Sequence, residues 1–194
     1  SNLYDLAPDA LARLLREVVS PAFRAKQVAE WLHLKGVDSF ESMTNLSKEQ
    51  REILRAQFSI AFPEVRERTA PSTDGTQKYL FTLADASLIE AVYMPMGDRT
   101  TLCLSSQAGC AVGCTFCVTG FFGAGRNLRP SEIVGQYEIL RHEKQIAPEH
   151  THLVFMGMGE PLLNLDNVAI ALEIFYQQIA PKRITLSTAG ITPA

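Results

Sequence analysis

Cys110-Ala111-Val112-Gly113-Cys114-Thr115-Phe116-Cys117 is the stretch of sequence that decides how the rest of the chain is interpreted. Together with Cys103 it contains all of the 4 cysteines in a chain of 194 residues. Disulfides staple distant segments of small secreted proteins, whereas thiols packed into one short segment are typical of metal or redox sites. The cluster of cysteines therefore predicts a metal site in this loop.

The spacing of Cys110, Cys114 and Cys117 favours a [4Fe–4S] cluster, because thiolate sulfur is the preferred ligand of such clusters. Three thiolates leave one iron open, and a small molecule with amino and carboxylate groups, such as S-adenosyl-L-methionine (SAM), can chelate it. Two alternatives remain open. A structural zinc site would need four ligands, usually as two separated Cys-x2-Cys pairs. An iron–sulfur electron-transfer module would use Cys103 as the fourth ligand.

The chain divides into three segments by its hydrophobic period. Residues 1–65 have helical spacing of apolar residues and are predicted to form a small helical accessory domain, with Ser47 and Gln50 as a capping box. In residues 66–99 apolar and polar residues alternate, and this segment is predicted to form linking β-strands. Residues 100–194 alternate between strands and helices, which predicts right-handed crossovers and a parallel α/β sheet. The expected helices and strands are 8–18, 22–34, 47–58, 77–83, 88–95, 100–105, 132–144, 152–156, 166–178 and 183–188, and another helix is expected to begin at residues 192–194.

Two further strand ends are expected to lie beside the cysteine loop, because ligands of α/β folds bind at the carboxyl ends of the strands. In Gly157-Met158-Gly159-Glu160-Pro161, Gly159 lets the backbone approach a ligand, and Glu160 can accept hydrogen bonds from an ammonium group. The alternative is an ordinary glycine turn stopped by proline. Ser187 and Thr188 end the third strand, and their hydroxyls either bind a ligand or cap the following helix.

Composition excludes some classes of protein. An apolar fraction of 46% and a charged fraction of 20% are those of a globular protein. Neither a membrane span nor a secretory signal is recognisable, so a cytoplasmic location is expected. A net charge of −3 argues mildly against a dedicated nucleic-acid binder, which usually has a basic surplus, but local basic pairs such as Arg126 and Arg129 leave nucleic-acid binding open.

The sequence resembles the RlmN/Cfr-type radical SAM RNA methyltransferases. The resemblance is specific from about residue 77 onward and is carried by residues 101–110, the cysteine loop, 119–128, 156–164 and 184–190. It implies a partial (β/α)6 barrel with about three strand–helix units, a [4Fe–4S] cluster, SAM, and 23S rRNA and tRNA as partners. Methylation is implied at carbon 2 of adenine, with carbon 8 as the alternative. A reductant protein such as flavodoxin or ferredoxin is implied as well.

The resemblance also implies roles for two residues outside the loop. Cys103 corresponds to the cysteine that resolves a covalent RNA intermediate by forming a disulfide, which requires an accessible thiol. Glu90 corresponds to the proton acceptor. On its strand it shares a face with Leu88, Val92 and Met94, so we expect desolvation to raise its basicity. The alternative is a glutamate on an edge strand whose side chain is turned to solvent. The cysteine that carries the methyl group in this family lies near the C-terminus, and no cysteine follows Cys117 here, so this sequence is expected to be a fragment.

Overall fold

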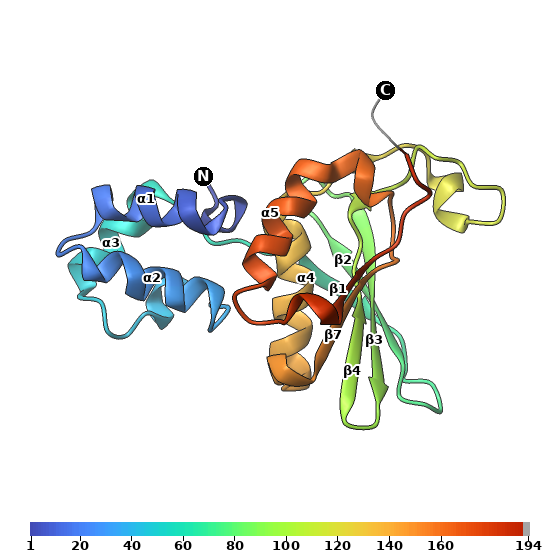
Figure 1. Cartoon of the computed structure of the whole chain (residues 1–194), viewed down its shortest axis with the longest axis horizontal. Helices are drawn as coiled ribbons and strands as arrows, with labels where there is room; N and C mark the ends of the chain where they lie inside the picture. The colour runs from blue at the N-terminus through green and yellow to red at the C-terminus, as the bar shows by residue number, and fades with distance from the viewer. Residues whose placement is uncertain (192–194) are drawn as a thin grey trace.

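The structure is a computed structural model that describes residues 1–191. A small group of helices at the N-terminus lies against the helical side of a mixed sheet (Figure 1). The predicted α/β class is confirmed. None of the helices in residues 1–191 combines the length and apolar character that a membrane span requires. The helix expected to begin at residues 192–194 lies outside the described residues.

The N-terminal helices form as their sequence predicts. The first has Pro8 in its first turn and buries Leu11 and Leu15, one turn apart on one face. The third begins at a capping box, in which Ser47 and Gln50 each accept a hydrogen bond from the other's backbone amide. The three helices are α1 (Pro8–Val18), α2 (Phe23–His33) and α3 (Lys48–Gln57).

One six-stranded sheet runs in the order β1-β2-β3-β4-β7-β8. Its first four strands pair antiparallel, and β4, β7 and β8 pair parallel. The strands are β1 (Glu64–Arg68), β2 (Gln77–Thr82), β3 (Leu88–Met96), β4 (Arg99–Cys103), β7 (Thr151–Phe155) and β8 (Ile184–Leu186). Sequence analysis missed β1, because an edge strand reading Glu-Val-Arg-Glu-Arg has no alternation of apolar and polar residues.

One face of the sheet carries the core. Helices α4 (Pro130–Lys144) and α5 (Leu165–Phe175) are the crossovers from β4 to β7 and from β7 to β8. They lie side by side over one face of the sheet (Figure 1), and Leu102 of β4 and Leu153 of β7 are completely buried. The alternate residues of the same strands, among them Cys103 and Val154, lie on the opposite face.

A two-stranded ladder that the sequence did not predict closes the cysteine loop. Strand β5 (Gln107–Ala108) pairs antiparallel with β6 (Arg126–Asn127), so residues 109–125 form a loop whose two ends lie next to each other. Gly125 has a φ of +57°, and a Cβ there would lie 1.5 Å from the Ala108 carbonyl oxygen. Only glycine allows the two ends to come this close.

The N-terminal helices are attached to α4 near both of its ends. Near its beginning, the Ser131 amide donates to the Asp5 carboxylate at 2.9 Å. Near its end, Arg141 donates to the Lys35 carbonyl at 2.9 Å and to the Glu138 carboxylate at 2.6 Å. The Glu138 side chain is 1% exposed, so its charge depends on Arg141 for compensation. Burial raises the pKa of Glu138, and Arg141 opposes that rise.

This pair provides a test of the fold. Arg141→Met leaves a buried carboxylate without its cation and should lower the free energy of unfolding by about 3–5 kcal/mol. The pKa of Glu138 then rises further. An acid whose folded pKa exceeds its unfolded pKa loses stability as the pH rises, so the deficit should shrink toward about pH 5. Urea unfolding measures both effects. Adding Glu138→Gln should recover part of the loss, and an unchanged single variant would contradict the assignment.

Candidate active site

The carboxyl ends of β4, β7 and β8 bring together the three segments that the sequence singled out. The cysteine loop follows β4 by way of β5, the Gly157–Glu160 segment follows β7, and Ser187 follows β8. In Figure 1 the cysteine loop, drawn in yellow, projects beside residues 187–191, which follow β8. The predicted juxtaposition of the three segments at one edge of the sheet is therefore present.

The cysteine loop presents its thiols at the surface. Cys110, Cys114 and Cys117 are free and partly exposed, and the last two line a cavity of about 230 Å³. Hydrogen bonds from the Thr119 hydroxyl and backbone amide lower the pKa of Cys117, which favours the thiolate that binds metal. Phe116 and Phe121, on the same loop, are 88% and 81% exposed.

The three thiols do not converge on one point. Within residues 1–191 no three His, Cys, Asp or Glu side chains lie close enough together to hold a single metal ion. A cubane ligated at three separate irons calls for more widely spaced sulfurs than one ion does. The donor set itself fits such a cluster, since it consists of free, accessible thiols on one short loop, one of them with a lowered pKa.

Cys103 is not accessible, contrary to the expectation for a resolving thiol. It lies between Val92 of β3 and Val154 of β7, and the residue is 8% exposed. Burial raises the pKa of its thiol, although a hydrogen bond with the Met156 backbone opposes the rise. All four cysteines are free in the structure, so no disulfide joins Cys103 to the cysteine loop.

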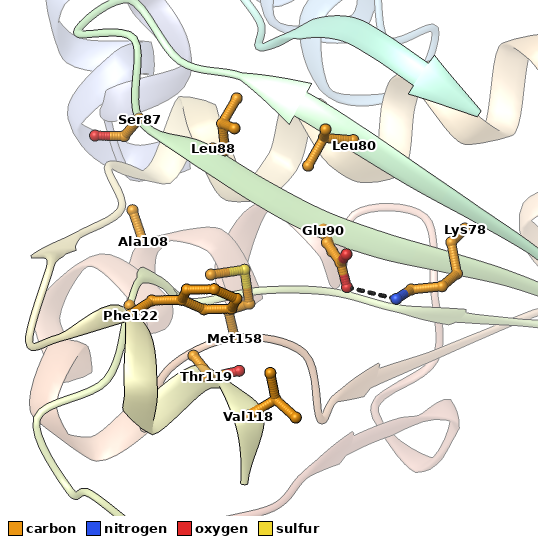
Figure 2. Close-up of a pocket in the computed structure, with 11 residues that line it drawn as sticks. Lys78, Leu80, Ser87, Leu88, Glu90, Ala108, Val118, Thr119, Phe122 and Met158 are labelled. Atoms are coloured by element: carbon orange, nitrogen blue, oxygen red, sulfur yellow. Dashed lines mark ion pairs between the residues drawn. The ribbon is translucent and has the colours of Figure 1, made fainter. Parts of the chain in front are cut away.

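Glu90 lies on the same face of the sheet as Cys103, because Val92 pairs with Cys103 and alternate residues share a face. It lines a cavity of about 600 Å³ together with Leu80, Phe122 and Met158. The expected desolvation is wrong. The Glu90 side chain is 45% exposed, and its carboxylate pairs with the Lys78 ammonium at 2.9 Å. Figure 2 shows the two charged groups meeting from neighbouring strands.

The glycine-rich segment after β7 packs against the chain itself. Gly159 has a φ of +100°, and a Cβ there would lie 2.5 Å from the Cβ of Gln107. A Cβ on Gly157 would lie 2.7 Å from the Leu104 carbonyl oxygen. Both positions therefore require glycine for close approach to the segment that leads into the cysteine loop, whereas the sequence had suggested close approach to a ligand.

Glu160 joins the ends of β7 and β8. Its carboxylate accepts hydrogen bonds from the Thr188 hydroxyl at 2.5 Å, the Ala189 amide at 2.7 Å and the Leu162 amide at 3.0 Å. Burial tends to raise the pKa of Glu160, but these hydrogen bonds outweigh it and lower the pKa. Ser187 is exposed and makes no side-chain hydrogen bond within the described residues. Thr188 is therefore the hydroxyl that this site uses internally.

Sequence analysis missed several polar residues of the site. Lys78 could have been found, because it alternates with Leu80 on the face that carries Glu90. The buried side chains of Gln107 and Asn164, by contrast, belong to segments too short or irregular to show a period.

Two family models match the chain. Residues 1–60 match the ribosomal RNA large subunit methyltransferase N-terminal domain, and residues 104–194 match the Radical SAM superfamily. The second match contains the three cysteines, the Gly157–Glu160 segment and Ser187.

Similar proteins match most of the chain. A dual-specificity RNA methyltransferase RlmN from Halorhodospira halophila is 48% identical over 100% of this chain and 54% of its own length. RlmN 2 from Myxococcus xanthus is 46% identical over 99% of this chain and 53% of its own length. The crystal structure of a radical SAM methyltransferase from Sphaerobacter thermophilus, 35% identical, superposes with a TM-score of 0.88 over 98% of this chain and 57% of its own.

The chain spans about half the length of the curated relatives it matches. It has the N-terminal domain of one family model and, beginning at residue 104, the radical SAM domain of the other, in the order expected from the resemblance. These matches and the geometry at the strand ends agree: over its described length the chain is similar to about half of an RlmN-type radical SAM methyltransferase.

Proposed function

We propose that this chain supplies the N-terminal portion of an enzyme that methylates carbon 2 of adenine in 23S rRNA and tRNA. The observation that carries the proposal is the cysteine loop, with three free thiols beside the Gly157–Glu160 segment at the carboxyl ends of parallel strands. Relatives named dual-specificity RNA methyltransferase RlmN favour carbon 2 over carbon 8. The three segments 1–65, 66–99 and 100–194 would then be the accessory domain, the linking strands and the radical SAM core.

Cys110, Cys114 and Cys117 would hold a [4Fe–4S] cluster, and Gly159, Glu160 and Ser187 would contact SAM. When bound, the cluster supplies the single electron that cleaves SAM. Glu160 is the residue of this group whose position the protein fixes most firmly, through three hydrogen bonds to its carboxylate. These donors hold the carboxylate ionised, which suits it to a cationic amine.

Glu90 would accept the proton that leaves the adenine carbon. The cavity beside it has about 600 Å³, within the range of small-molecule sites, and its apolar wall of Leu80, Phe122 and Met158 suits a flat base. Lys78 holds the carboxylate on this wall through their ion pair. Cys103 would resolve the intermediate as a thiolate that attacks the sulfur of the methyl-carrying cysteine, a residue that this sequence does not contain. A disulfide would form while the bond from that sulfur to the transferred carbon breaks, and the electron pair of the broken bond would stay with the carbon on the base. The buried thiol of Cys103 must first become accessible and lose its proton.

The partners follow from this assignment. RNA would approach the face of the sheet that carries Glu90, with a flavodoxin- or ferredoxin-type reductant delivering electrons to the exposed cysteine loop. The location would be the cytoplasm, where both RNA partners are found.

The function can be tested in two stages. In the first, the chain is reconstituted anaerobically with iron and sulfide and then given SAM and reductant, and deoxyadenosine is measured by mass spectrometry. In the second, a protein that contains this sequence and has the full length of its relatives is incubated with unmodified rRNA and tRNA. The RNA is then digested and analysed for carbon-2 methyladenosine. We expect both products, and Cys117→Ala should abolish both. Deoxyadenosine with no methylated RNA would reject the proposed substrate.

The cluster assignment predicts which cysteines matter. Changing any one of Cys110, Cys114 or Cys117 to Ala should remove bound iron, because a cluster left with two thiolates is poorly held. Cys103→Ala should retain the iron and serves as the control. Iron and sulfide analysis of each variant measures this, and equal loss in Cys103→Ala would establish a fourth ligand instead.

The assignment of Glu160 predicts the strength of SAM binding. Glu160→Ala should weaken it by about 1.5–3 kcal/mol, the scale of a charged hydrogen bond. Thr188→Val removes one donor to the carboxylate and keeps the charge, so its effect should be smaller. Calorimetry on reconstituted protein separates the two variants. Unchanged affinity in Glu160→Ala would show that the carboxylate does not contribute to SAM recognition.

A further inference from the structure

One buried amide joins the cysteine loop to the segment that carries Glu160. Gln107 is 5% exposed and lies in β5, at the start of the cysteine loop. Its carbonyl oxygen accepts a hydrogen bond from the Glu160 backbone amide at 2.8 Å. Its amide nitrogen donates to the Asn127 side-chain oxygen, at the end of the same loop, at 2.7 Å. A single side chain therefore contacts both ends of the loop and the glycine-rich segment.

Asn127 and Asn164 extend this connection. The Asn127 amide donates to the Leu163 carbonyl at 3.0 Å. The buried Asn164 amide donates to the carbonyls of Ser106 and Leu128 at 2.8 Å each, so it links the residue before β5 to the residue after β6. Gln107 lies at the centre of these contacts. It is the described side chain that bonds both to the end of the loop and to the backbone of Glu160.

Backbone hydrogen bonds hold the same region independently of the Gln107 side chain. The amides of Ser106 and Gln107 both donate to the Met158 carbonyl, at 2.9 and 3.1 Å. The two segments should therefore stay together when the side chain is shortened or made apolar. The side chain adds a further constraint: it fixes the position of the Glu160 backbone relative to the two ends of the cysteine loop.

We propose that Gln107 is a positioning residue that sets the distance between the cluster ligands on one segment and the SAM-binding residues on the other. The inference rests on the proposed function, because it needs a cluster on the loop and SAM at Glu160. SAM must contact the open iron and the protein at the same time. A wrong distance between the cysteine loop and the Glu160 segment therefore weakens SAM binding even when the cluster is intact. Gln107 would act through its hydrogen bonds with the Glu160 amide and the Asn127 side chain.

Gln136 supplies a matched control. It is a completely buried glutamine in α4, and its side chain accepts from the Ser105 amide at 2.9 Å and donates to the Ser105 carbonyl at 3.0 Å. It therefore has the burial and bonding of Gln107 but does not contact the cysteine loop or Glu160. Gln107→Met and Gln136→Met each remove one buried side-chain amide and replace it with an apolar side chain of similar volume. Gln107→Asn keeps an amide and shortens its reach by one methylene.

The experiment uses the reconstituted chain and three readouts: bound iron, the change in the EPR spectrum of the reduced cluster on addition of SAM, and SAM affinity by calorimetry. We expect Gln107→Met and Gln107→Asn to keep their iron and to bind SAM about tenfold or more weakly, with a diminished EPR change, as loss of a buried hydrogen bond implies. Gln136→Met should bind SAM as the unmodified chain does, even where its thermal stability falls equally.

Amide hydrogen exchange tests the geometry without the cofactors. In the apo chain, Gln107→Met should accelerate exchange at the Glu160 amide and leave the Ser105 amide protected, whereas Gln136→Met should do the reverse. If Gln107→Met loses its iron, or if both methionine variants weaken SAM binding equally, the side chain has only a structural role and the inference is overturned. Unchanged SAM binding in both Gln107 variants overturns it as well. An unmodified chain whose cluster does not respond to SAM would instead reject the proposed function.

Discussion

The parallel pairing of β7 with β4 and β8 is the interaction on which the rest of this structure depends. Parallel neighbours end at the same edge of a sheet, so three segments far apart in the sequence must leave the sheet side by side. Each crossover then returns through a helix on one face, which gives Leu102 and Leu153 their burial and leaves Cys103 and Val154 on the other. The same parallel strands therefore carry both the core and the site, and a change in their pairing would displace both.

Polar groups at this edge have no strand partner, and side chains satisfy many of them. Ser105 illustrates the point. Its hydroxyl donates to the Glu90 carbonyl at 2.6 Å and accepts from the Met158 amide at 2.8 Å, so it connects β3 to the segment after β7. Buried hydrogen bonds of this kind cost more to break than they contribute when formed, because the group left behind is unsatisfied. The edge is consequently held in a defined shape before any ligand arrives.

How much of this could be read from the sequence depends on whether a residue belongs to a periodic segment. The helix around Leu11 and Leu15 has a hydrophobic period of 3.6, the strands around Glu90 and Cys103 have a period of 2, and all were predicted. The capping box at Ser47 was predicted from the spacing of Ser47 and Gln50. The environment of Glu90 was not, because period assigns a face and cannot say that Lys78 on the next strand reaches its carboxylate. The same limit applies to Cys103, whose burial comes from two neighbouring strands. The ladder of β5 and β6 has two residues in each strand, too few for any pattern.

The attachment of the N-terminal helices to α4 has a mechanical consequence. The contacts of Ser131 and Arg141 lie ten residues apart on one rigid helix, roughly 15 Å at the rise of an α-helix. A body held at a single point can swivel about it in every direction. One held at two points can only rock about the line that joins them, and that line is the axis of α4. The surface that α1–α3 present to solvent can thus turn relative to the strand ends only about the axis of α4, because this one helix both crosses over between β4 and β7 and holds the N-terminal helices.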